Sequence, residues 1–169
     1  MKHHILHGAG LALRPTLLAP LKKRAPDALQ FLELTPPDWV GVGGRVGQDL
    51  QQLTQRYPCV CLSQSLSMGG PSALDPDVLR DLRVFMATHN VQVFSEALAW
   101  SADDAPLFIN LPIPSTQAAV AWTLARIAHV QEALGLRIGI RNVAHHMKPL
   151  QVEMNEAQFI SAVVGASDR

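Results

Sequence analysis

The chain is poor in aromatic residues, charged residues and cysteine. Aromatic residues make up 5% of its 169 residues and charged residues 17%, whereas hydrophobic residues make up 48%. A core of sufficient size for one domain must therefore consist mainly of Leu, Val, Ile and Ala. The formal net charge is zero and no segment carries a basic stripe, which argues against nucleic-acid binding.

No stretch of the sequence approaches the roughly 18 consecutive apolar residues that a membrane-spanning helix needs. The first 15 residues do not form a good signal peptide, because His7, Gly8 and Gly10 interrupt the apolar stretch. We therefore expect a cytoplasmic protein that binds neither membranes nor nucleic acid.

The two cysteines, Cys59 and Cys61, lie in a short apolar segment, CVCL. In a strand, their side chains would point to the same face about 6.6 Å apart. That arrangement suits neither a disulfide nor a redox pair of the C-x-x-C type. The pattern favours two small buried residues.

Strand and helix patterns alternate along the chain. The expected strands are residues 8–13, 29–34, 59–62, 91–94 and 137–140. The expected helices are residues 16–24, weakened by Pro20, residues 46–57, a segment that begins at Asp75-Pro76, residues 116–134 and residues 156–164. About five β-α units in a row predict an α/β fold with a parallel sheet.

Polar residues gather just after the strands, as at Thr35, Glu96 and Asn142. In a (β/α) barrel this is the face that carries active sites, but a doubly wound sheet has the same property. No G-x-G-x-x-G motif separates the first strand from the first helix, which argues against a nucleotide site.

Several motifs, in order along the chain, resemble one enzyme family. They are the opening GAGL with LRP, then FLELTPPDWVGVGG, LSMGGPSALD, SEALAW, LPIPST, RNVAHH and EMNEAQF. Together they cover nearly the whole chain and are similar to the multinuclear non-haem iron-dependent oxidases, formerly domain of unknown function 692, and to UPF0276-like proteins. The resemblance implies a TIM-barrel fold like that of xylose isomerase. It also implies two or three irons at the C-terminal mouth of the barrel, and oxidation of cysteines in small peptides, often with a partner protein.

Most of the metal-ligand positions that the resemblance implies are substituted. Leu62 and Ala97 stand where the family has histidine, Asn110 where it has aspartate, and Arg141 where it has glutamate. Leucine and alanine cannot donate to a metal, and arginine adds a positive charge. Of the implied ligands, two persist as vestigial metal candidates, Glu96 and Asn142.

Five further side chains are candidates for the pocket: Glu33, Asn110, Arg141, His145 and His146. Since Arg141 replaces a carboxylate, we expect it to pair with Glu96, although Glu96 reaching water at a half-open mouth is an alternative. The adjacent histidines lie in a loop, and a metal-ligand role for them is the less favoured interpretation.

The sequence therefore predicts a single truncated domain over residues 1–169, a partial (β/α) TIM-type barrel that stays open. The barrel of the family it resembles has about three more β-α units. We therefore expect a degenerate, non-catalytic pseudoenzyme that has no cofactor and acts through protein interaction. The rival hypothesis is an iron-dependent enzyme that modifies cysteines of a small peptide, its site completed by another chain. A small-molecule binding module is a third, weaker hypothesis.

An open sheet of apolar strands leaves edges and faces that need cover. We expect a homodimer, or another protein partner, to cover them. The alternative is that residues 3–6 or 150–154 fold back as makeshift strands.

Overall fold

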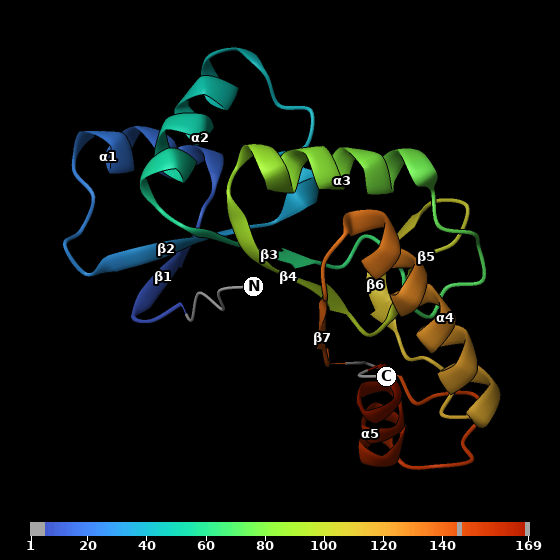
Figure 1. The fold of residues 1–169 in the computed structure, drawn as a ribbon. Helices are drawn as coiled ribbons and strands as arrows, with labels where there is room; N and C mark the ends of the chain where they lie inside the picture. The colour runs from blue at the N-terminus through green and yellow to red at the C-terminus, as the bar shows by residue number, and fades with distance from the viewer. Residues whose placement is uncertain (1–5, 145–146, 168–169) are drawn as a thin grey trace. The chain divides into compact units, whose positions relative to one another are not determined.

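The computed structural model describes residues 6–144 and 147–167. Five strands form one open sheet in the order β1-β2-β3-β4-β7, and strands alternate with helices along the chain (Figure 1). The ladders β1–β2, β2–β3 and β4–β7 are parallel. The strands are β1 (Ala9–Ala12), β2 (Leu29–Leu34), β3 (Cys59–Ser63), β4 (Val91–Ala97) and β7 (Gly139–Arg141). The α/β class and the open, partial TIM-type arrangement predicted from the sequence are confirmed.

The chain forms two compact units. The first unit comprises Met1–Leu62 and Arg80–Phe94, and the second comprises Ser63–Leu79 and Ser95–Arg169. In the described residues, no helix is both long and apolar enough to cross a membrane.

Before β3, the helices of the first unit are two short 3-10 helices and two α-helices. They are η1 (Pro15–Leu17), α1 (Leu18–Lys23), η2 (Pro36–Asp38) and α2 (Gly44–Arg56). Pro20 does not break α1, because it lies in the first turn, where no intrahelical N–H bond is lost. Helix α1 packs on α2, which buries Leu50 and Leu53 as expected. Val46, which helical spacing places on the same face as Leu50 and Leu53, is 42% exposed in the first turn of α2.

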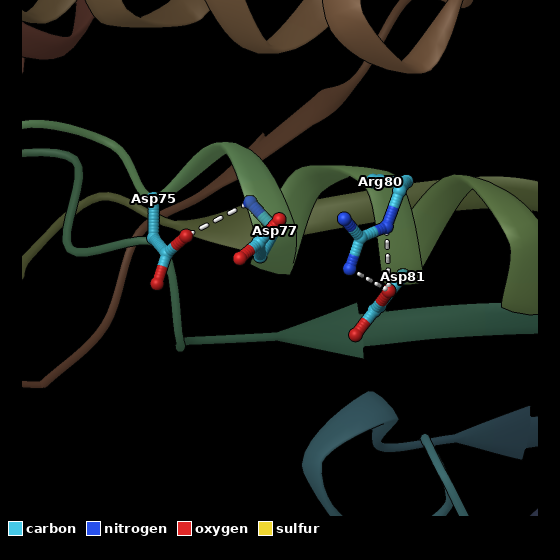
Figure 2. A network of polar contacts seen from close by, with 4 residues as sticks. All are labelled: Asp75, Asp77, Arg80 and Asp81. Atoms are coloured by element: carbon cyan, nitrogen blue, oxygen red, sulfur yellow. Dashed lines mark hydrogen bonds and ion pairs between the residues drawn. The ribbon is translucent and has the colours of Figure 1, made fainter.

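Helix α3 (Pro76–Thr88) begins where the Asp-Pro signal predicts. The Asp75 carboxylate accepts a 2.8 Å hydrogen bond from the backbone N–H of Asp77, as Figure 2 shows. One turn further on, Arg80 pairs with Asp81 at 3.0 Å on an exposed face (Figure 2). Four apolar residues at helical spacing are buried on one face of α3: Leu79, Leu82, Phe85 and Met86.

In the second unit, α4 (Gln117–Leu134) packs on α5 (Glu156–Ser167). The Thr116 hydroxyl caps α4 by accepting a hydrogen bond from Ala119 N–H at 3.1 Å. Gly135 ends that helix in the left-handed conformation, with φ 72°. Asn155 Oδ1 caps α5 through Gln158 N–H at 2.9 Å, also as expected.

The sequence did not predict the antiparallel hairpin of β5 (Trp100–Ala102) and β6 (Pro106–Leu111). Strand β6 begins with Pro106 and continues with three consecutive apolar residues, Leu107 to Ile109, so no period-two alternation marks it. The strand expected at residues 91–94 is longer in the structure, where β4 comprises Val91–Ala97. Residue Glu96 therefore lies inside β4 instead of just past its end.

Residues 150–154, one of the two segments that the alternative hypothesis folds back, make a single parallel bridge, between Val152 and Ser115. Ser115 N–H donates to the carbonyl of Gln151, and Glu153 N–H donates to the carbonyl of Ser115, each at 2.9 Å. One bridge is too short to count as the makeshift strand of the alternative. Of residues 3–6, only Leu6 is within the described residues.

Cys59 and Cys61 are free and fully buried, as expected. Burial raises the pKa of each thiol to about 12, and at Cys61 the neighbouring Cys59 adds to the effect. Both thiols therefore stay protonated at neutral pH and act as small core residues.

Candidate functional site

Glu96 is the most deeply buried charged residue among those described. It lies in β4, and none of its surface is exposed to solvent. Its Oε1 accepts a hydrogen bond from the backbone N–H of Leu66 at 3.4 Å. Its Oε2 is buried and has no hydrogen-bond partner in the described part of the chain. A carboxylate with so few partners is costly to keep ionised in the interior.

Burial raises the pKa of Glu96 to about 7. Smaller effects oppose it: the Ser63 hydroxyl, the N–H groups of Leu66 and Ala97, and the positive charge of Arg141 all lower the pKa. At neutral pH, a substantial fraction of this carboxyl group is therefore protonated and carries an O–H donor.

Arg141 does not pair with Glu96. Its Nη2 donates to the backbone carbonyl of Ser63 at 3.0 Å, and no ion pair between Arg141 and Glu96 occurs among the described contacts. The expected ion pair is therefore wrong, and the strand register supplies the reason. Glu96 lies opposite Ile140, whereas Arg141 lies opposite Ala97. Because side chains alternate between the two faces of a sheet, an offset of one residue directs Glu96 and Arg141 to opposite faces.

Arg126 of α4 is a second buried charge, which the sequence analysis did not single out. Its side chain is 7% exposed, and burial lowers its pKa. Its Nη1 donates to the carbonyl of Ser72 at 2.6 Å and its Nη2 to the carbonyl of Leu66 at 2.9 Å. The burial of Arg126 could have been predicted from helical spacing, because Arg126 lies on the same buried face of α4 as Thr123, Ile127 and Val130.

The loop between β3 and α3 is held by serine hydroxyls. Ser67 has a φ of 49°, and its Oγ accepts hydrogen bonds from the N–H groups of Ser101 and Ala102 at 3.0 Å each. The same Oγ donates to the carbonyl of Ala102 at 2.8 Å. The hydroxyls of Ser63 and Ser65 bond to each other at 2.9 Å. These serines organise the loop, and none contacts a histidine in the described residues that would activate it.

A cavity of about 650 Å³ lies within the second unit and includes Asn142 in its lining. Asn142 Nδ2 donates to Glu156 Oε1 at 3.2 Å, and its Oδ1 accepts from Val143 N–H at 3.0 Å. Leu98 and Phe159 contribute apolar walls. Of the residues expected at the metal site, only Asn142 lines this cavity, and Glu96 does not.

The other predicted site residues are scattered. Asn110 lies in β6, where its Nδ2 donates to Gln64 Oε1 at 3.2 Å. Glu33 lies in β2 of the first unit, opposite Val60 of β3. His145 and His146 lie outside the described residues.

Within residues 6–144 and 147–167, no group of three or more His, Cys, Asp or Glu side chains is placed to hold a metal ion. Glu96 and Asn142 are each engaged with groups of the protein itself, Leu66 in one case and Val143 and Glu156 in the other.

Residues 8–169 match the model of a family described as the RiPP precursor modification enzymes MbnB/TglH/ChrH. The chain is also similar to curated UPF0276 proteins. One, from Shewanella sediminis, is 36% identical over 159 residues, which cover 94% of this chain and 57% of that protein. Another, from Pseudomonas aeruginosa, is 35% identical over 168 residues, which cover 99% of this chain and 59% of that protein. A third, from Acinetobacter baylyi, is 37% identical over 165 residues, covering 96% and 56%. This chain thus spans somewhat more than half the length of these relatives, and it belongs to the MbnB/TglH/ChrH family of RiPP precursor modification enzymes.

Proposed function

We propose that this chain, unlike other members of the family, does not carry out iron chemistry and acts by binding other protein chains. The observation that carries this proposal is the state of Glu96. It is fully buried, it bonds to a backbone N–H, and burial raises its pKa to about 7. At neutral pH a substantial fraction of this carboxyl group is therefore neutral, which leaves less charge for a cation to balance.

The donor set does not fit a cluster of two or three irons. Iron in such a site takes imidazole and carboxylate ligands. Of the six positions where the resemblance implies ligands, four carry other residues: Leu62, Ala97, Asn110 and Arg141. Asn110 is bonded to Gln64, and the Arg141 guanidinium brings a positive charge that lowers the pKa of Glu96. A cation would have to compete with that charge, so we derive no catalytic step through iron.

The exposed sheet edges support the second part of the proposal, that this chain binds other protein chains. In the first unit, the edge strand β1 is built from small residues, and Ala9, Gly10 and Ala12 are exposed. In the second unit, the other edge strand, β7, is three residues long and only partly covered. Exposed strand edges carry N–H and C=O groups that favour pairing with another chain. We therefore propose a homodimer or a protein partner as the state in which this protein works.

The test is an assay on a cysteine-containing peptide. The chain is incubated with Fe(II), air and an equimolar peptide, and the mass of the peptide is followed by mass spectrometry. The proposal predicts the same peptide mass with the wild-type chain as with the Glu96→Gln variant, which controls for oxidation by free iron. A change in peptide mass that occurs with the wild type and is lost in Glu96→Gln would establish the rival, an iron-dependent enzyme.

A further inference from the structure

The first unit contains a pocket of its own, of about 350 Å³, between the loop after β2 and the C-terminal part of α3. The loop contributes Trp39 and Val42, and the helix contributes Val84 and Phe85, so the walls are mostly apolar. The indole N–H of Trp39 is buried, so this residue offers the pocket ring surface and no accessible donor. A pocket of this size is at the lower end of the range that binds small molecules.

The hydrogen bonds of His89, which also lines this pocket, determine which of its ring nitrogens carries the proton. The Thr54 hydroxyl donates to the carbonyl of Gln51 at 3.2 Å, and its Oγ1 lies 3.0 Å from His89 Nδ1. Because a hydroxyl has one proton, His89 Nδ1–H is the donor in the second bond. Burial lowers the pKa of His89 and so favours the neutral ring. In that ring Nε2 carries a lone pair, and it is the nitrogen that remains for a ligand.

The polar side-chain atoms that the pocket offers to a ligand are all acceptors. His89 Nε2 is one of them, because Nδ1 carries the proton. Thr88 donates its hydroxyl proton to the Val84 carbonyl at 2.8 Å, which leaves its oxygen as a second acceptor. The Asp81 carboxylate is the third. It accepts two hydrogen bonds from Arg80, both at Oδ1, so Oδ2 remains for a ligand (Figure 2).

These acceptors lie at the two ends of the pocket. Asp81 and Thr88 are seven residues apart in α3, and a rise of 1.5 Å per residue separates them by about 10 Å along the helix axis. His89 follows Thr88 directly, and its ring packs against Phe85 with 4.5 Å between the ring centroids. Val84 and Phe85 lie between the two ends. The complementary ligand therefore has a hydrogen-bond donor at each end and an apolar middle.

We propose that this pocket binds a small aromatic amine, with the ammonium group on Asp81 and a hydroxyl or N–H donor at the opposite end on His89 Nε2. Asp81 is the charged side chain among the described residues that line the pocket, and its negative charge selects a cation. The rings of Trp39 and Phe85 favour an aromatic body over an aliphatic one. The site goes beyond the proposed function, which involves no small molecule, and neither depends on the other.

The first experiment is calorimetric titration of the full chain with three probes. Tyramine has both donors, phenethylamine lacks the hydroxyl, and 4-ethylphenol lacks the ammonium group. We expect saturable binding of one tyramine per chain. Each of the other probes should bind about threefold to tenfold more weakly, because each leaves one acceptor of the pocket without its donor.

The second experiment assigns the ammonium end by substitution. Asp81→Asn should weaken tyramine and phenethylamine by about fivefold, as expected for a partly exposed ion pair, and leave 4-ethylphenol unchanged. The Asp81 side chain is 50% exposed, so this variant should fold normally. The matched control is Asp27→Asn, which removes the same charge from an exposed residue of the same unit outside the pocket. It should leave the affinity for all three probes unchanged.

The third experiment examines the histidine end by nitrogen NMR of the chain with labelled histidine. In the free chain His89 should be the Nδ1–H form, with Nε2 unprotonated. Tyramine should shift the Nε2 signal of His89, and phenethylamine should leave it in place, because only tyramine has a hydroxyl to donate. His129 lies in α4 of the second unit and is the internal control.

The absence of saturable tyramine binding would overturn this inference, as would equal affinities for tyramine and phenethylamine. Equal effects of Asp81→Asn and Asp27→Asn would indicate a general attraction of cations to the surface and would also overturn it. So would a protonated Nε2 in the free chain, since His89 would then offer a donor and not an acceptor.

Discussion

Arg126 and Glu96 hold the backbone of the same residue, Leu66. The Arg126 guanidinium donates to the Leu66 carbonyl at 2.9 Å, and the Leu66 N–H donates to Glu96 at 3.4 Å. Two buried ionisable groups thus fix one loop residue without contacting each other. The loop after β3 is held here by interactions within the protein itself.

The first prediction concerns the pH dependence of stability. Burial raises the pKa of Glu96 from 4.5 to about 7 in the folded state. Between these values the folded state binds more protons than the unfolded state, so the free energy of unfolding falls as the pH rises through this window. Relative to acidic pH, where Glu96 is neutral in both states, ionisation of Glu96 lowers the free energy of unfolding by about 3 kcal/mol by pH 8.

The measurement is urea denaturation of the wild type and Glu96→Gln at several pH values. The difference in the free energy of unfolding between the wild type and the variant reports on Glu96, because His89 is present in both proteins. Burial lowers the pKa of His89, so the stability that His89 contributes is lost as the pH falls. Glu96→Gln should be close to the wild type at pH 5 and more stable than it at pH 8. A difference that does not change between these pH values would mean that Glu96 is not a neutral acid in the fold.

The second prediction concerns Arg126. Replacing it with Met keeps much of its apolar volume but leaves the carbonyls of Ser72 and Leu66 without their donors. We expect a loss of about 2–4 kcal/mol in the free energy of unfolding. Arg80→Ala is the matched control, because that side chain is 63% exposed and exposed ion pairs contribute about 0–1 kcal/mol. Equal losses in the two variants would show that the contacts of Arg126 are unimportant.

The third prediction concerns Gly10 in β1. A Cβ added there would lie 2.1 Å from Cε2 of Phe31, so Gly10→Ala must displace the ring and should cost about 1–3 kcal/mol. Gly165→Ala is the opposite case, since its Cβ would have no atom within 4 Å. As a substitution within α5, it should stabilise the fold by up to about 1 kcal/mol. Thermal unfolding of both variants checks the two signs, and a neutral Gly10→Ala would disprove the close packing.

The fourth prediction concerns the start of α3. Asp75→Ala removes the 2.8 Å cap on Asp77 N–H and should cost about 0.5–2 kcal/mol. Asp75→Asn keeps an oxygen acceptor at the same place and should retain most of the stability. Chemical denaturation distinguishes the two, and an equal loss in both variants would attribute the effect to charge at the helix end and not to the cap.

Much of the fold could be predicted because local signals agree with it. Strand β2 was expected at residues 29–34 and is observed there, and Asp75 and Gly135 mark helix ends as their chemistry implies. The hairpin escaped prediction for a local reason as well. Leu107, Phe108 and Ile109 form an apolar run without the alternation that identifies a half-buried strand.

The candidate site was less predictable, because it depends on register and on backbone partners. The sequence pattern predicts Glu96 just after a strand, whereas the structure buries it inside β4. Its partner could not be predicted, since a shift of one residue between β4 and β7 separates it from Arg141. The Leu66 N–H that bonds to it belongs to a loop 30 residues away along the chain, and a backbone donor leaves no mark in the sequence.

The central proposal is that this chain has lost the iron site that the sequence resemblance implies, and iron binding tests it most directly. The untagged chain is loaded anaerobically with Fe(II), washed with a mild chelator and analysed for iron per chain. The variant Asn110→Asp/Arg141→Glu, which returns two carboxylates, is treated in the same way. We predict less than one iron per chain for the wild type, the same value for Glu96→Gln, and a higher value for the double variant. Two or more irons per wild-type chain, lost in Glu96→Gln, would contradict the account.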